Sequence, residues 1–171
     1  MQKYRFREYQ PKYLKYFKKE KARLQKVLGD QALIEHVGST AVPGLGGKGL
    51  VDIAIAVSKK DLQIAKKKLE KARYVFRETS SAVTILFFRK DYKDKQKRTR
   101  RVHIHLTTYA SKDWKAMLAF RDYLRTHPKE AKKYTKIKKE AIKIAKGEGE
   151  KYRKHKKRFI QDLIKKANNP F

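Results

Sequence analysis

The eight residues LVDIAIAV, at positions 50–57, constrain the fold more than any other part of this 171-residue sequence. A short run of apolar and β-branched residues is typical of a strand buried on both faces of a sheet. Alternation along such a strand directs Asp52, Ala54 and Ala56 toward one face. A carboxylate in a buried strand is unfavourable by several kcal/mol unless it is paired, hydrogen-bonded, metal-bound or at an open rim. Asp52 is therefore the first candidate for a functional residue.

A glycine-containing turn precedes this strand. A strand predicted over residues 31–37, QALIEHV, runs directly into Gly38, Ser39 and Thr40. The backbone amides of such a turn can form an anion-binding concavity, and the two hydroxyls can donate to phosphate oxygens. Lys48, in the following loop, could add a positive charge. Each signal is weak alone, but their order ahead of the Asp52 strand predicts a phosphate site.

Two histidines occupy alternate positions in the apolar sequence VHIHLTTY at residues 102–109. As a strand, this segment points His103 and His105 to the same face. If it pairs with the strand of Asp52, both imidazoles lie beside the carboxylate. They would then act in proton transfer, or His105 would share a metal ion with Asp52, or both would be hydrogen-bonded strand residues. Imidazole suits Zn²⁺, Mn²⁺ or Ni²⁺ better than Mg²⁺.

Three further residues are candidates for the wall of the same pocket. Glu35 and His36 precede the turn, and in a regular strand one of them faces the pocket while the other is buried. Arg121 lies beside Asp122 in the sequence AFRDYL. The pattern favours an internal ion pair or a contact that shapes the substrate pocket over a catalytic role.

The remaining elements follow from periodicity and from turn-forming residues. The sequence favours a single α/β domain (equally describable as α+β) over residues 1–171, with a sheet-containing core in 1–110 and C-terminal helices in 111–171. The sheet is expected to be small and mixed, with flanking helices. The predicted elements are an edge strand over 3–9, helices over 11–29 and 61–73, strands over 74–78 and 82–91, a charged loop over 93–101, and three helices from Ser111 onward, separated near His127-Pro128 and between Gly147 and Gly149.

The charge of the chain limits its partners. There are 47 Lys and Arg residues against 17 Asp and Glu, which gives a net charge of +30. Such a charge favours nucleic acid, including RNA, as a partner, while a proteome rich in lysine explains it equally well. The region from Lys129 onward interleaves basic and aromatic residues, which could bind phosphates and bases or form a solvated face over a core.

Other compositional features exclude several classes of site. Cysteine is absent, so the chain forms neither disulfides nor thiolate metal sites. The N-terminal sequence lacks the apolar core of a signal peptide, and no segment approaches the length of a membrane span. These features favour a cytoplasmic protein without membrane association.

Several motifs together resemble one family. EHVGSTAVPGLGGKGLVDIAIAV is similar to the signature of the GrpB-type family, an incompletely characterised group within the nucleotidyltransferase superfamily. RVHIHLTTY resembles the histidine-containing strand of the family, and WKAMLAFRDYLRTHPKEAKKY resembles its C-terminal helical motif. The N-terminal YQPKYLKYFKKEKARLQKVLGD and the final KKRFIQDLIKKA also match, so the resemblance spans nearly the whole chain.

The resemblance implies a nucleotidyltransferase-type sheet and transfer of a nucleotidyl group from a nucleoside triphosphate. The superfamily site uses a Gly-Ser turn, an Asp-x-Asp strand and a third carboxylate to hold Mg²⁺ or Mn²⁺. This sequence has Ala54 in place of the second aspartate, and His103 and His105 where the third carboxylate would be. The alternatives are a catalytically inactive RNA-binding module and, because GrpB-type domains resemble an extension of some dephospho-coenzyme A kinases, an accessory role in coenzyme A metabolism.

Overall fold

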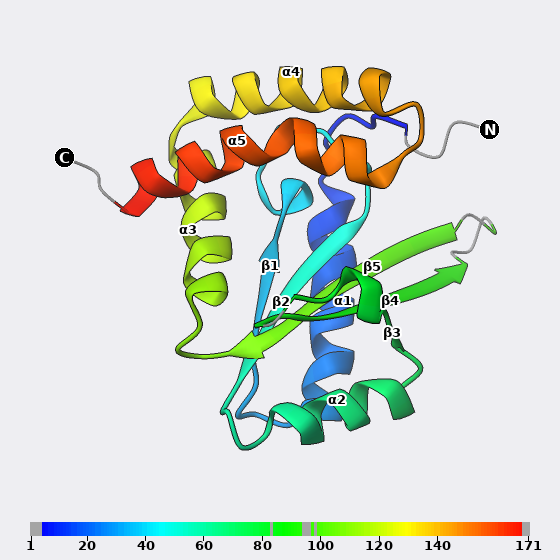
Figure 1. Ribbon diagram of the computed structural model, residues 1–171. Helices are drawn as coiled ribbons and strands as arrows, with labels where there is room; N and C mark the ends of the chain where they lie inside the picture. Colours follow the sequence, from blue (N-terminus) through cyan, green and yellow to red (C-terminus); the bar gives the residue numbers. More distant parts are fainter. Residues whose placement is uncertain (1–4, 83, 94–96, 98, 169–171) are drawn as a thin grey trace.

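The computed structural model describes residues 5–82, 84–93, 97 and 99–168, which form a mixed five-stranded sheet with helices on both faces (Figure 1). The strands are β1 (Leu33–Val37), β2 (Val51–Val57), β3 (Val75–Phe76), β4 (Leu86–Lys93) and β5 (Thr99–Thr108). The helices are α1 (Lys12–Leu28), α2 (Leu62–Lys71), α3 (Lys112–Thr126), α4 (Pro128–Ala145) and α5 (Gly149–Asn168), with short 3₁₀ turns η1 (Ser39–Ala41) and η2 (Glu78–Ser80).

The strand order is β1-β2-β5-β4-β3. β2 is antiparallel to β1 and parallel to β5, while β4 is antiparallel to both β5 and β3. The sheet is therefore mixed, and the expected α+β class is confirmed. The strand LVDIAIAV occupies an interior position, and its residues Ile53, Ala54 and Ile55 are fully buried.

The two faces of β2 carry side chains of different size. Ile53 and Ile55 pack with α1 and α2 in the main apolar cluster, where large side chains fill the space between the layers. On the opposite face Ala54 and Ala56 pack with Trp114 of α3. Small residues here let α3 approach the sheet closely. The alternation of LVDIAIAV thus sets which helix covers which face.

Helices α4 and α5 lie side by side across one end of the sheet, near the ends of β1 and β2 (Figure 1). Their apolar residues cover the loop between these strands: Val42 and Leu45 from the loop pack with Tyr134 of α4 and Leu163 of α5. Pro128 occupies the first turn of α4, which suits its missing amide hydrogen. Among the described residues, no helix is long and apolar enough to cross a membrane.

Several local expectations differ from the structure. The strands predicted over 74–78 and 82–91 are β3 (Val75–Phe76) and β4 (Leu86–Lys93). The segment predicted as an edge strand over 3–9 forms only an isolated bridge between Arg7 and Gly47 within its described part. Phe6 packs instead against apolar residues of α4 and α5, among them Ala141 and Tyr152. The charged loop expected over 93–101 instead belongs partly to the β4–β5 hairpin. Asp91 lies opposite Arg101 and accepts hydrogen bonds from it, so a charged pair stabilises the strands there.

Candidate functional site

Asp52 and the two histidines form one cluster on the α3 face of the sheet. The parallel register places Asp52 opposite His103 and Ala54 opposite His105. His103 Nδ1 lies 3.3 Å and His105 Nε2 3.4 Å from Asp52 Oδ1. All three side chains are about a quarter exposed, at 23%, 22% and 25% for Asp52, His103 and His105. The structure thus brings together a carboxylate and two imidazoles within reach of solvent.

The carboxylate of Asp52 is ionised. Burial opposes its charge, but hydrogen bonds from His103 and His105 hold its pKa well below the usual range. An ionised carboxylate accepts hydrogen bonds, so each histidine presents an N–H to it. This leaves Nε2 of His103 and Nδ1 of His105 as the other ring nitrogens. Phe87 contacts both rings edge-on, with centroids 4.9 and 5.2 Å away, and fixes their orientation.

Gly38 packs directly against the carboxylate of Asp52. A Cβ atom at this position would lie 2.6 Å from Asp52 Oδ2, closer than real Cβ contacts occur. The backbone of Gly38 also has a φ of +71°, which side chains disfavour. The Gly-Ser turn and the Asp52 strand therefore meet at a point that only glycine fits.

The hydroxyl of Thr40 faces the interior. It donates to the carbonyl of Leu50 at 3.1 Å and lies 2.9 Å from Nε2 of His36. The ring of His36 stacks on Phe17, with centroids 4.7 Å apart. Burial lowers the pKa of His36 to about 4, so the imidazole is neutral at physiological pH and donates its Nε2–H to Thr40. The buried contacts of Thr40 with His36 and with the carbonyl of Leu50 thus anchor the turn to the protein interior.

Ser39 meets a lysine that sequence reasoning missed. Nζ of Lys138, on α4, donates to Ser39 Oγ at 3.0 Å and to the carbonyl of Gly46, although Lys138 is fully buried. Burial lowers its pKa to about 7. The available signal was its place in an apolar stripe, four residues after Tyr134 and three before Ala141.

Lys48 and Lys156 complete a cationic group beside the turn. Their Nζ atoms lie 3.9 and 4.2 Å from the ring centroid of Tyr152 on α5. Lys156 and Lys138 also lie 6.0 and 4.6 Å from the ring centroid of Tyr134. Two buried tyrosines thus gather three ammonium groups, which we call the lysine cluster: Lys48, Lys138 and Lys156.

Two members of the lysine cluster, Lys48 and Lys156, lie close enough to Asp52 to interact with it electrostatically. Burial lowers the pKa of Lys48 to about 7 and that of Lys156 to about 8, while the charge of Asp52 opposes both shifts. Neither Lys138 nor Lys156 forms a salt bridge with any described residue. The other charged groups that act on the cluster are Arg101 and Arg153 on Lys48, Arg153 on Lys156, and Glu8 on Lys138.

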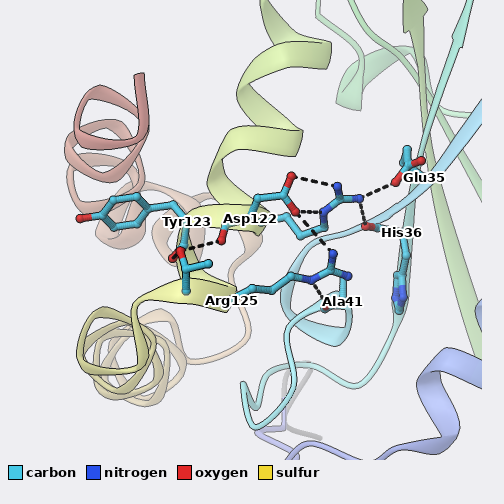
Figure 2. A network of polar contacts seen from close by, with 8 residues as sticks. Glu35, His36, Ala41, Asp122, Tyr123 and Arg125 are labelled. Atoms are coloured by element: carbon cyan, nitrogen blue, oxygen red, sulfur yellow. Dashed lines mark hydrogen bonds and ion pairs between the residues drawn. The ribbon is translucent and has the colours of Figure 1, made fainter. Parts of the chain in front are cut away.

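Glu35 and Arg121 belong to a separate network that braces the turn. Figure 2 shows Glu35, His36, Asp122 and Arg125 of this network. Arg121 donates to Glu35 at 2.6 Å, to Asp122 and to the backbone carbonyl of His36. Arg125 reaches from the same helix to the carbonyl of Ala41 at 3.0 Å. The expected ion pair of Arg121 and Asp122 is thus present within α3. The bonds of Arg121 to Glu35 and His36 connect α3 to β1, and the bond of Arg125 to Ala41 connects it to η1.

The side chains of Asp52, His103 and His105 do not fit a two-Mg²⁺ site. Such a site needs several carboxylate oxygens, and Asp52 supplies the only carboxylate among these three side chains. Ala54 is sealed in the apolar cluster with Trp114, so a carboxylate there would displace α3. No group of three or more His, Cys, Asp or Glu side chains in the described part of the chain could hold a metal ion.

Two surface hollows lie elsewhere. One of about 420 Å³ is formed by α4 and α5 and includes Glu130, Phe159 and Asp162. The other, of about 320 Å³, includes Pro43 and Arg125. Neither contains Asp52 or the histidines. The chemistry-bearing residues therefore form a partly exposed cluster, outside both of these hollows.

Comparisons with known proteins identify relatives along the whole chain. Residues 3–166 match a family model described as GrpB protein. A UPF0157 protein of Halalkalibacterium halodurans is 31% identical over 163 residues, covering 94% of this chain and 80% of the relative. The glutamate-rich protein GrpB of Alkalihalophilus pseudofirmus is 29% identical and covers 86% of each chain. The crystal structure of the conserved protein GrpB from Enterococcus faecalis superposes with a TM-score of 0.80 at 27% identity, covering 95% and 96% of the two chains.

Proposed function

The chain belongs to the GrpB family, and we propose that it binds a nucleoside triphosphate or another phosphorylated ligand beside Ser39 and transfers a nucleotidyl group. The observation that carries this proposal is the convergence on one place of an ionised Asp52, two imidazoles and three lysines, of which Lys138 is buried and Lys48 and Lys156 are half-buried. A polyphosphate needs cations, and a hydroxyl acceptor needs a base.

The Asp52–His103 pair supplies the base. With Nδ1–H of His103 donated to Asp52, Nε2 of the same ring is free to accept the proton of an attacking hydroxyl. The hydroxyl oxygen bonds to the α-phosphorus, the bond to the leaving pyrophosphate breaks, and the negative charge of the pyrophosphate is stabilised by the lysine cluster. Asp52 stabilises the imidazolium that forms. No step in this scheme passes through a metal ion.

Release of labelled pyrophosphate from nucleoside triphosphates tests the reaction. Asp52→Asn and His103→Gln should each lower the rate on the order of a hundredfold or more, because the base is lost or wrongly oriented. Asp162→Asn, which changes an exposed carboxylate on α5, is the control. Turnover that survives Asp52→Asn in a folded protein would rule out this mechanism.

A thermal-shift panel tests ligand identity and the expected dependence on Mg²⁺ or Mn²⁺. Nucleotides, coenzyme A precursors and divalent metals are added separately and together, and a ligand that binds the native state raises the melting temperature. Stabilisation by coenzyme A precursors alone would favour the accessory role in coenzyme A metabolism. Nucleotide stabilisation that requires Mn²⁺ would show that the ligand brings the missing oxygen donors.

A second candidate function is RNA binding without catalysis, favoured by the net charge of +30 and by the absence of a second carboxylate at Ala54. It predicts association with tRNA or single strands whose affinity falls steeply as salt rises. Fluorescence anisotropy at several salt concentrations measures this. Absence of binding at low salt would exclude it.

A further inference from the structure

The C-terminal helices contribute cations to the Asp52 site that the turn and the strands do not supply. Lys156 comes from α5 and shares the ring of Tyr152 with Lys48 of the loop. Asp52 acts electrostatically on both lysines. The site is therefore built from three parts of the chain, with the loop and α5 providing two partly buried ammonium groups beside one another.

We propose that Lys48 and Lys156 bind the outer phosphates of a ligand that carries a chain of two or three phosphates. The inference rests on the proposed function, because it takes the first phosphate of the ligand to lie at Ser39 beside Asp52. α5 and the loop between β1 and β2 then distinguish ligands by their number of phosphates. Lys138 is outside this contact set, since it is fully buried and two of its three donors serve Ser39 and the carbonyl of Gly46.

The charge balance supports a polyphosphate. Lys48 and Lys156 lie near one another beside the carboxylate of Asp52, and Arg101 and Arg153 add further positive charge. Tyrosine faces attract cations without neutralising them. Ammonium groups held together in a partly buried site repel one another, and a chain of phosphates offsets that repulsion. Burial is the main cause of the lowered pKa of Lys48, and the charge of Lys156 lowers that pKa further.

The geometry also separates the inner from the outer phosphates. Ser39 receives its hydrogen bond from Lys138 on the side of α4, whereas Lys48 and Lys156 gather at Tyr152 on α5. A single phosphate at Ser39 would not extend to the ammonium groups at Tyr152. A longer chain reaches both and gains charge-assisted hydrogen bonds from each ammonium group.

Isothermal titration calorimetry on the full chain tests the inference with three probes: orthophosphate, pyrophosphate and tripolyphosphate. Near-physiological salt is used because the +30 charge attracts any polyanion at low salt. We expect affinity to rise from orthophosphate to tripolyphosphate. Lys156→Gln and Lys48→Gln should each weaken tripolyphosphate about tenfold or more and change orthophosphate by less than about twofold.

Lys157→Gln is the matched control, because it removes the same charge from an exposed neighbour on the same helix. Equal losses in Lys156→Gln and Lys157→Gln would overturn the inference, as would equal affinity for orthophosphate and tripolyphosphate or no binding of either. Circular dichroism verifies that each variant is folded.

The two proposals fail separately. If Lys156→Gln leaves tripolyphosphate affinity unchanged while Asp52→Asn abolishes nucleotidyl transfer, the inference is wrong and the proposed function stands. If tripolyphosphate binding depends on Lys156 while Asp52→Asn leaves transfer intact, the proposed mechanism is wrong and the polyphosphate site stands.

Discussion

At the scale of single residues, Gly38 is the point at which the turn and Asp52 touch. Replacing it with alanine should destabilise the fold by roughly 2–4 kcal/mol, since the strain of a positive φ adds to a clash with the carboxylate. Gly44→Ala is the control, because Gly44 has a φ of +77° but open space where its Cβ would be. We expect that control to lose only about 1 kcal/mol. Urea unfolding measures both, and equal losses would show that contact with Asp52 is unimportant.

His36 should make stability depend on pH. Its pKa is about 4 in the folded protein against 6.5 for the free side chain, so the unfolded state binds more protons between these values. The stabilisation is therefore complete above pH 6.5 and is lost as pH falls toward 4, by up to roughly 3 kcal/mol. Urea unfolding across this range should give a shallower pH dependence for His36→Gln than for His127→Gln, which alters an exposed imidazole. Equal slopes would contradict the assignment.

At the scale of elements, the role in binding that we propose for Lys156 of α5 should come at the expense of stability. Lys156→Met keeps the aliphatic stem against Tyr134 and Tyr152 and removes a charge that burial disfavours. We expect the unliganded protein to gain about 0.5–1 kcal/mol, a gain common when functional strain is relieved. Lys157→Met, on the exposed side of the helix, should be neutral. A melting temperature that falls in Lys156→Met would show that the charge is stabilising.

The sheet could be predicted from the sequence, but the C-terminal half of the site could not. Alternation along VDIAIAV and VHIHL determines which side chains share a face, so the meeting of Asp52 with His103 and His105 follows once the strands pair. The meeting of Lys138 with Ser39 depends on how α4 packs over the loop, a contact between residues 99 positions apart. Lys156 lies four residues after Tyr152 and three before Phe159, so helical periodicity places it toward the apolar face of α5, but periodicity does not show which loop that face meets.

Helix α3 shows the same limit of sequence-based prediction for Glu35 and Arg121, two of the residues predicted to line the pocket. The sequence predicts an ion pair of Arg121 with Asp122, and the structure contains it. It does not predict that Arg121 also bonds Glu35 of β1, which turns a local pair into a brace between a helix and a strand. An ion pair between neighbours in sequence can be predicted from the sequence. A network that joins several elements can be predicted only when the packing of α3 on the sheet is known, and that packing depends on the small side chains of Ala54 and Ala56.

At the scale of the whole molecule, part of the positive charge is gathered in the lysine cluster and the rest is spread over the surface. A few exposed lysines pair with nearby carboxylates, as Lys151 does with Glu148 and Lys133 with Glu130, and such surface pairs contribute little to stability. The lysine cluster differs because burial and neighbouring charge lower the pKa of each member. Its charge is therefore the part of the total that responds most to a bound anion.

Binding of a polyphosphate should therefore take up protons. With pKa values of about 7, 7 and 8, the lysines of the cluster are largely neutral at about pH 8.5, and an anion beside them favours their charged forms. ATP, whose phosphates are fully ionised there, should bind with uptake of roughly two protons, and at about pH 6 with almost none. Calorimetry in two buffers of different ionisation enthalpy gives the number, and Lys156→Gln should reduce it by about one proton while Lys157→Gln should not. Equal apparent enthalpies in both buffers at the higher pH would mean that the lysines stay charged without a ligand.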